Sequence, residues 1–338
     1  MSFSTSSRRA LGGRQALLAE VERLGRDVLG GADPFEEALH ALADGDGLPP
    51  GLTPEMLFVG GIPRIRPLLV SLAARVGSVE GRLDPEAAFE AACVAELLHA
   101  GIRVHDAALG RPHGRRRRAA RKVLKATWWL GGNHLSLRAL EIARRLPAPE
   151  ILGDLLETMR EVAEGHALGE ELRRREPTAA DAIQHAEGRA GAVFSFACRA
   201  GGRLGGVERH AVAGLSRYGR HVGVAWQLSE DLASFERPEE RRELLADAAW
   251  TRPLYPVAWA NQEDPEVGRL WGQVRERGEG EVVDLLAERV RATGGLVAGR
   301  SALIQQTWAA RQALVDLPET PARQAMERLA GSLARAAA

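Results

Sequence analysis

Three short segments of the sequence place charged side chains beside long apolar stretches, where a sheltered chemical site is expected. Arg64 and Arg66 stand in GIPRIRPLL, just before an apolar stretch. Asp106 follows a long apolar run in ELLHAGIRVHDAALG, and Glu230 and Asp231 end another in WQLSEDLASF. Arginines near a helix start suit phosphate recognition, and carboxylates suit Mg²⁺, a hard cation that takes oxygen ligands and substrate phosphate. The pattern indicates a site for a phosphorylated ligand.

Each of these signals also has a plainer interpretation. An arginine pair is often a solvated helix start, and a single aspartate at a helix end is often simply exposed. Three histidines could be proposed as metal ligands: His99, His105 and His134. They are better interpreted as polar residues of a helical bundle that are hydrogen-bonded within the protein, because no Glu-x-x-His pairing accompanies them. The basic run at 114–122 is equally consistent with a solvated loop and with an anion site. Nucleic-acid binding is not favoured, because no aromatic residues interleave with the run.

The elements that must position these side chains all show the 3.6-residue period of α-helices. Residues 14–29 carry one apolar stripe, and Asp84 followed by Pro85 is typical of an N-cap and first helical turn. Further helices are predicted over 117–146, 149–175, 178–204 and 208–236. Alternating β patterns are absent, so the sequence predicts an all-α fold in one large bundle.

Composition limits the class of protein. The 338 residues contain 45% hydrophobic and 27% charged side chains, with Lys+Arg and Asp+Glu equal at 45 each. We expect residues 1–12 to be disordered and 13–338 to form a single domain. Two cysteines cannot form a disulfide framework, and neither a signal peptide nor a membrane-spanning stretch is evident. These features predict a soluble, cytoplasmic protein without a nucleic-acid partner.

Several segments, taken in order, resemble the motifs of the trans-isoprenyl diphosphate synthase (polyprenyl synthetase) family over roughly residues 55–260. GIPRIRPLL is similar to GGKRxRPxL, and ELLHAGIRVHDAALG to ELIHxxSLIHDDxxD. LGGNHLSLRALEIA is similar to LAGDYLLARAFEL, and GRAGAVFSFACRAGGRLGG to the family's K-T-x-x-L-F segment. YGRHVGVAWQLSEDLASF is similar to YGxxLGxAFQxxDDxxD, and RPLYP to KxTLP. The shared order makes this resemblance specific although no single motif decides it.

The resemblance implies an isoprenoid-synthase bundle in which two aspartate-rich helix ends hold an allylic diphosphate through Mg²⁺. It implies that Arg64, Arg66, Arg189 and Gln227 bind diphosphate, and that Asp106, Glu230 and Asp231 remain from the metal site. It also implies an apolar product channel, lined by Gly101 five residues before Asp106, where a small residue predicts a long tail. Family members commonly dimerise through helices, so a homo-oligomer or a hetero-oligomer with an active prenyl synthase is expected.

The departures from the family pattern fall on the residues that carry its chemistry. In the first aspartate-rich motif Ala107 and Gly110 replace two carboxylates, and Ser234 replaces the last one of the second motif. Asn133 replaces the aspartate of the family's GD pair, and Pro63 replaces the lysine of GGKRxRP. Arg189 and Ala190 replace the K-T pair, and His166 replaces a glutamine. Since metal clamps on a departing phosphate are usually a large catalytic contribution, Mg²⁺ binding is predicted to be weakened or lost.

Two functions remain open from the sequence. The first is a non-catalytic or weakly active partner or regulatory subunit, or a protein that binds an isoprenoid diphosphate. The second is an active prenyltransferase with a non-standard metal site, in which Asp106, Glu230 and Asp231 hold Mg²⁺ while Arg64, Arg66 and Arg189 hold phosphate.

Overall fold

A computed structural model of the chain describes most of its residues and places them almost entirely in helices. The described residues are 15–26, 33–44, 47–58, 64–77, 83–109, 115–236, 241, 245, 252–277 and 281–336. The expected disorder of residues 1–12 concerns a segment outside these ranges. Within them no strand occurs, which confirms the all-α prediction.

The helices follow one another with short connections. After a helical stretch at 15–26, they are α2 (Asp33–Ala43), α3 (Pro54–Leu57), α4 (Ile65–Gly77), α5 (Pro85–Leu109), α6 (Arg115–Ala143), α7 (Glu150–Leu172), α8 (Ala179–Ala186), the π-helical turn η1 (Glu187–Gly191), α9 (Ala192–Leu204), α10 (Arg209–Glu236), α12 (Tyr255–Glu263), α13 (Pro265–Arg277), α14 (Glu281–Ala292), α15 (Gly295–Gln312) and α16 (Pro321–Ala336). None of the described helices is both long and apolar enough to cross a bilayer.

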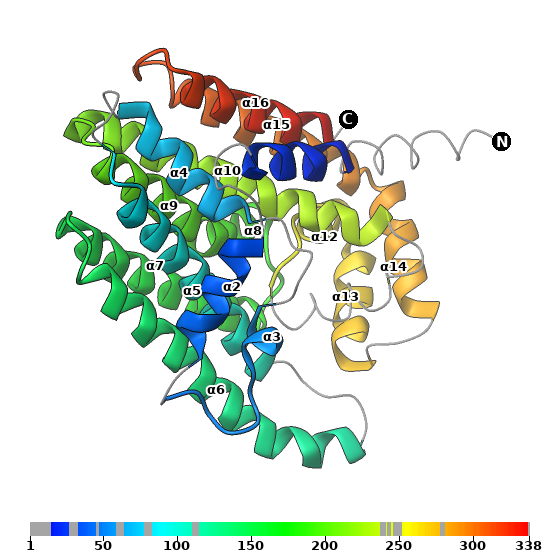
Figure 1. The fold of residues 1–338 in the computed structure, drawn as a ribbon. Helices are drawn as coiled ribbons and strands as arrows, with labels where there is room; N and C mark the ends of the chain where they lie inside the picture. Colours follow the sequence, from blue (N-terminus) through cyan, green and yellow to red (C-terminus); the bar gives the residue numbers. More distant parts are fainter. Residues whose placement is uncertain are drawn as a thin grey trace.

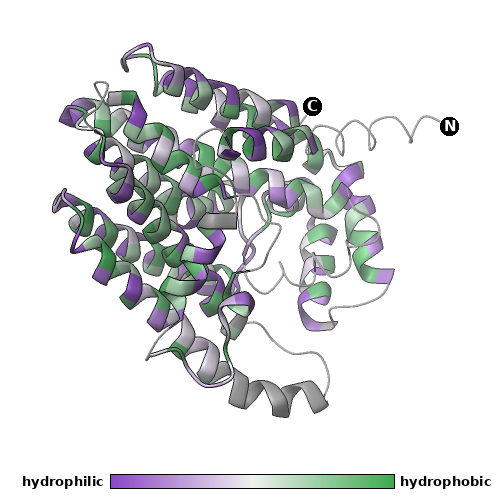
Figure 2. Ribbon diagram, viewed as in Figure 1, coloured by the Kyte–Doolittle hydropathy of each residue, from purple (hydrophilic) through white to green (hydrophobic). Residues whose placement is uncertain are grey.

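The centre of the bundle is formed by α4, α5, α9 and α10, which pack closely on one another (Figure 1). The outer helices cover this centre: α6 packs on α5, α7 on α9, and α15 on α10. Apolar side chains from Leu17 to Leu333 join into one core cluster. Figure 2 shows this as green inner helix faces with purple outer ones. The two helices that carry the predicted carboxylates, α5 and α10, are therefore largely sheltered from solvent, as their apolar composition predicts.

Local signals at helix starts are confirmed. The Asp84 side chain accepts hydrogen bonds from the backbone N–H groups of Glu86 (3.0 Å) and Ala87 (3.3 Å). Thr178 and Asp181 form a reciprocal capping box at the start of α8. Each interaction satisfies backbone donors that the first helical turn leaves without a partner.

The helix predicted over 178–204 differs from the observed structure. It begins as α8, widens into the π turn η1 at Glu187–Gly191, and continues as α9. The turn lies where α7 passes very close: a Cβ on Gly165 would lie 2.9 Å from the Gly188 carbonyl oxygen. The periodicity of apolar residues does not reveal one wide turn inside a long helix, so the sequence predicts one continuous helix where the structure has three pieces.

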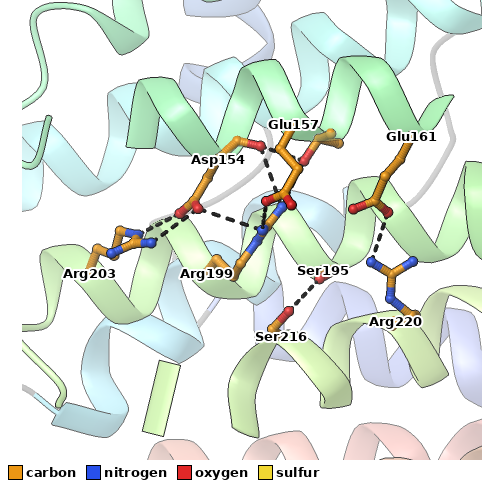
Figure 3. Close-up of polar contacts among 9 residues, drawn as sticks. Asp154, Glu157, Glu161, Ser195, Arg199, Arg203, Ser216 and Arg220 are labelled. Atoms are coloured by element: carbon orange, nitrogen blue, oxygen red, sulfur yellow. Dashed lines mark hydrogen bonds and ion pairs between the residues drawn. The ribbon is translucent and has the colours of Figure 1, made fainter. Parts of the chain in front are cut away.

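A seam of charged residues joins α7 to α9 and α10 (Figure 3). Asp154 is buried and accepts hydrogen bonds from Arg203 Nε (2.5 Å) and Nη2 (3.1 Å). Along the same face Arg199 pairs with Glu157 (2.8 Å) and Arg220 pairs with Glu161 (2.8 Å). Bidentate arginine–carboxylate contacts favour one relative placement of the elements that carry them. The seam therefore helps to set α7 against the helices that carry the site.

Helices α4 and α9 approach each other so closely that glycine is required between them. A Cβ added to Gly201 would collide with the Val70 carbonyl oxygen, and one added to Gly205 with that of Ala74. These backbone atoms cannot move as a flexible side chain can. The position of α4, with Arg64 and Arg66 at its start, thus depends on the small size of two residues of the 201–205 segment.

Replacing Gly201 with alanine is expected to lower the free energy of unfolding by about 2–3 kcal/mol, because the methyl group overpacks the α4–α9 contact. Urea denaturation followed by circular dichroism measures this. Gly153→Ala on α7 is the matched control: its Cβ meets nothing within 4 Å. It should raise stability by about 0.5–1 kcal/mol through helix propensity. Equal effects of the two substitutions would contradict the packing argument.

Candidate functional site

Asp106, near the C-terminal end of α5, contacts the side chains of Arg189 and His166. Its Oδ2 accepts a hydrogen bond from Arg189 Nη2, and its Oδ1 lies 3.0 Å from His166 Nε2. Burial raises the pKa of the Asp106 carboxyl, but Arg189 and His166 together lower it further, so that the net shift is downward. Asp106 is therefore an ionised carboxylate with a protein donor on each oxygen.

His166 is held between two hydrogen-bond acceptors. Its Nδ1 lies 3.1 Å from the Val162 carbonyl oxygen, and its Nε2 faces the ionised Asp106. His166 and Arg189 thus flank Asp106 on its two carboxylate oxygens. The π turn η1 carries Arg189, in keeping with the frequent occurrence of such turns at functional sites.

Asp231, on α10, is closed in a similar way. Its side chain is 3% exposed, and its Oδ1 accepts from Arg252 Nε (3.1 Å) and Gln227 Nε2 (2.9 Å). Its Oδ2 accepts from the Tyr255 backbone N–H at 3.3 Å. Burial raises the pKa of Asp231, and the three donors offset part of this effect. Gln227 donates to Asp231 within the same helix, and its role in binding diphosphate stays a prediction.

The other positions of the second acidic motif do not complete a ligand set around Asp231. Glu230 precedes Asp231 on α10 and is partly buried. Ser234, one turn later, is turned onto its own helix, where its hydroxyl donates to the Glu230 carbonyl oxygen at 3.1 Å. Of the first motif, the Ala107 side chain and Gly110 lie outside what the structure describes.

The predicted diphosphate arginines Arg64 and Arg66 are engaged by acidic side chains. Arg64 makes two 2.5 Å hydrogen bonds to Glu36 and one of 3.1 Å to Glu96. Arg66 bonds Glu96 at 2.8 and 3.3 Å. The Glu96 side chain is 1% exposed, and a buried carboxylate of this kind requires charged partners. The two arginines therefore neutralise Glu36 and Glu96, and their role in binding diphosphate stays a prediction.

Gly101 lies in the contact between α5 and α6. A Cβ there would lie 3.1 Å from the Gly132 carbonyl oxygen and 3.2 Å from Ser136 Oγ. A large side chain would push α6 away from α5, so a Gly101→Phe experiment would measure packing as well as ligand length. The role of Gly101 in lining a channel stays a prediction.

The three histidines considered as metal ligands are not gathered around an ion. His134 Nε2 bonds the Ala43 carbonyl oxygen at 2.9 Å, whereas His105 Nε2 is buried without a partner. In the part of the chain that the structure describes, no three His, Cys, Asp or Glu side chains lie together as a metal site requires.

The carboxylate oxygens of the two site aspartates have protein partners in the structure. Mg²⁺ needs near-octahedral oxygen ligands, while every carboxylate oxygen of Asp106 and Asp231 already accepts a hydrogen bond from the protein. The sequence motifs do not predict that Arg189, His166 and Arg252 contact the site aspartates. The arginines at 189 and 252, where the family has lysines, are a sequence signal for two of these contacts.

Comparison with known proteins agrees with this fold. The family model described as polyprenyl synthetase matches residues 55–288. The chain is 28% identical to octaprenyl diphosphate synthase of Escherichia coli (strain K12) over 279 residues, 80% of this chain and 85% of that protein. It is also 28% identical over 213 residues to heptaprenyl diphosphate synthase component 2 of Geobacillus stearothermophilus, 61% of this chain and 64% of that protein.

Solved structures show the same architecture. A decaprenyl diphosphate synthase from Rhodobacter capsulatus superimposes with a TM-score of 0.76 at 24% identity, covering 93% of this chain and 98% of that one. A polyprenyl synthase from Caulobacter crescentus CB15, in complex with calcium and isoprenyl diphosphate, gives 0.74 at 22% identity over 94% and 97% of the two chains. The predicted isoprenoid-synthase fold is confirmed.

Replacing Arg252 with methionine should lower the free energy of unfolding by about 3 kcal/mol at pH 7, because it leaves the buried Asp231 carboxylate without its cation. The loss should shrink at low pH. A carboxyl group whose pKa is raised in the folded state does not lower the free energy of unfolding below its unfolded pKa, about 3.9. Above that pH it lowers the free energy of unfolding increasingly as the pH rises. Chemical denaturation at pH 7 and pH 5 measures both effects. The double variant Asp231→Asn, Arg252→Met should recover part of the stability, and a larger loss than in the single variant would contradict the pairing.

Proposed function

We propose that this chain, which belongs to the polyprenyl synthetase family, is a non-catalytic or weakly active member that binds an isoprenoid diphosphate. The observation that carries the proposal is the pairing of its two site aspartates with arginines, Asp106 with Arg189 and Asp231 with Arg252. A divalent ion would bring positive charge to such carboxylates. Here the guanidinium groups of Arg189 and Arg252 supply it. The carboxylates are already neutralised, so their attraction for a metal is reduced.

A fixed arginine differs from a metal ion in what it does for a leaving diphosphate. A metal acts as a Lewis acid and bridges several oxygens, while a guanidinium group only donates hydrogen bonds and charge. Losing a metal clamp typically removes several kcal/mol of transition-state stabilisation, and each 1.4 kcal/mol is a factor of about ten in rate. Binding of a diphosphate needs less: a sheltered set of donors suffices. The site therefore supports recognition better than bond cleavage.

A role beside an active synthase is compatible with this chemistry. One relative, at 28% identity, is named heptaprenyl diphosphate synthase component 2, a name for one component of a synthase. A chain with this fold, whose two site aspartates are already paired with arginines, is suited to binding a ligand or supporting a partner without turning substrate over.

The purified chain, incubated with isopentenyl diphosphate, allylic diphosphates of several lengths and Mg²⁺, is expected to form product at least about a thousandfold more slowly than an active relative. Released pyrophosphate and extracted prenyl products measure the rate. The Escherichia coli octaprenyl diphosphate synthase, assayed alongside, is the control. Turnover comparable with that enzyme, and abolished by EDTA, would overturn the proposal in favour of an active prenyltransferase with a non-standard metal site.

Millimolar Mg²⁺ is expected to change the midpoint of thermal unfolding by less than about 1 °C, because an ion that does not bind the native state does not stabilise it. Differential scanning fluorimetry with Mg²⁺ or with EDTA measures the shift. The variant pair Arg189→Ala and Arg252→Ala tests the cause: removal of these cations exposes the carboxylates and should make the midpoint more sensitive to Mg²⁺. A clear Mg²⁺-dependent rise in the unaltered chain would argue against the closed site.

A further inference from the structure

One face of α15 exposes large apolar side chains to solvent. The helix packs on α10 through its other face and lies along one edge of the bundle (Figure 1). Ten large apolar side chains are exposed among the described residues, and four of them lie on α15 or the turn after it: Val297, Ile304, Trp308 and Val315. Trp308 is 65% exposed. Since apolar side chains gathered on one exposed face mark interaction surfaces, this face of α15 is a candidate for one.

The exposed side chains follow the spacing of a coiled-coil seam. From Val297 they recur after four, three, four, three and four residues, at positions 301, 304, 308, 311 and 315. The turn after Gln312 continues the helical course, because the Val315 N–H donates to the Gln312 carbonyl oxygen at 3.2 Å. Alternation of three and four gives a narrow stripe that fits one partner helix. A helix that lies in a lipid surface has a broad apolar face instead.

The seam is complementary to itself when a second copy of the chain runs in the opposite direction. We place a two-fold axis level with Gln306 and perpendicular to the helix. Ile304 and Trp308 are two residues before and after this point, so each faces the other across the axis. Val297 and Val315, nine residues before and after it, face each other in the same way. Every apolar side chain of the seam therefore meets an apolar side chain.

The polar positions of the seam select the antiparallel direction. Ser301 and Arg311 are five residues before and after Gln306, so they too face each other in an antiparallel pair. The Ser301 hydroxyl donates to the Val297 carbonyl oxygen at 3.0 Å, and its oxygen can accept from a guanidinium group. A parallel pair would instead place Arg311 against Arg311, and α15 contains no aspartate or glutamate to offset these charges. Antiparallel helices also have opposed dipoles, which attract.

We propose that the exposed face of α15 is a self-association surface, on which two copies of this chain pair as antiparallel helices. Trp308 is its anchor, because aromatic side chains at the centre of an interface contribute most to binding. The seam is about 27 Å long and about 10 Å wide. This is less than the roughly 800 Å² per partner of a standard interface, so the association is weak and reversible, with a micromolar Kd.

Cysteine cross-linking tests the pairing and its direction. Ile304→Cys and Trp308→Cys variants of the full chain, mixed in equal amounts and oxidised, should form a disulfide-linked pair, because the two positions face each other. Ile304→Cys alone, about 6 Å out of register, and Val297→Cys mixed with Trp308→Cys, about 10 Å out of register, should link at least about tenfold more slowly. The two native cysteines are buried and do not compete.

Charge substitutions test the energetics. Trp308→Lys, and separately Ile304→Glu, should raise the Kd of self-association about thirtyfold or more. The double variant should recover part of this loss, because the introduced glutamate and lysine face each other across the axis. Sedimentation velocity over a concentration series compares the parent with the variants, so association through any other surface appears equally in all of them. Both positions are exposed, so unchanged thermal midpoints show that the fold is intact.

Three results would overturn this inference. The first is equal sedimentation of the parent and Trp308→Lys, and the second is cross-linking of Ile304→Cys alone that is as fast as the mixture. The third concerns lipid: the chain would bind phosphatidylcholine–phosphatidylglycerol vesicles through Trp308 and would not self-associate. The face would then be a membrane surface.

Discussion

The rest of the site depends on the need to neutralise a carboxylate at the end of a buried helix. Asp106 lies near the end of α5, a helix of largely apolar composition, and an unpaired charge in such a sheltered position is costly. The structure meets the need with Arg189 from the π turn and His166 from α7. Three elements distant in sequence are therefore held at one point by electrostatics, and the same logic recurs at Asp231, where α10 meets the segment before α12.

This arrangement changes what the bundle can recognise. A site closed by metal ions responds to the ions in solution, whereas a site closed by arginines has its charge set when the chain folds. The glycine contacts between α4 and α9 and the charged seam between α7 and α9 keep the helices in place. The charged side chains at the ends of α5 and α10 are consequently held in fixed positions by the packing of these helices.

Much of the fold follows from sequence, and less of the site does. Apolar stripes and the Asp84-Pro85 start predict the helices, and the order of motifs predicts which helix ends converge. Glu36 could not be predicted as an ion-pair partner, because it lies outside the matched motifs and meets Arg64 only through tertiary packing. Arg189 and Arg252 stand at motif positions, but the sequence does not show which carboxylates they contact.

The π turn at Glu187–Gly191 has a consequence for how this segment is compared with other chains. A π turn contains one residue more than an α turn, so the residues before and after it are out of phase by about 100° around the helix axis. A related chain with an uninterrupted helix there would direct a different position towards the end of α5. Gap-free alignment across residues 179–204 would then pair side chains that point in different directions, and the equivalence of Arg189 must be established in three dimensions.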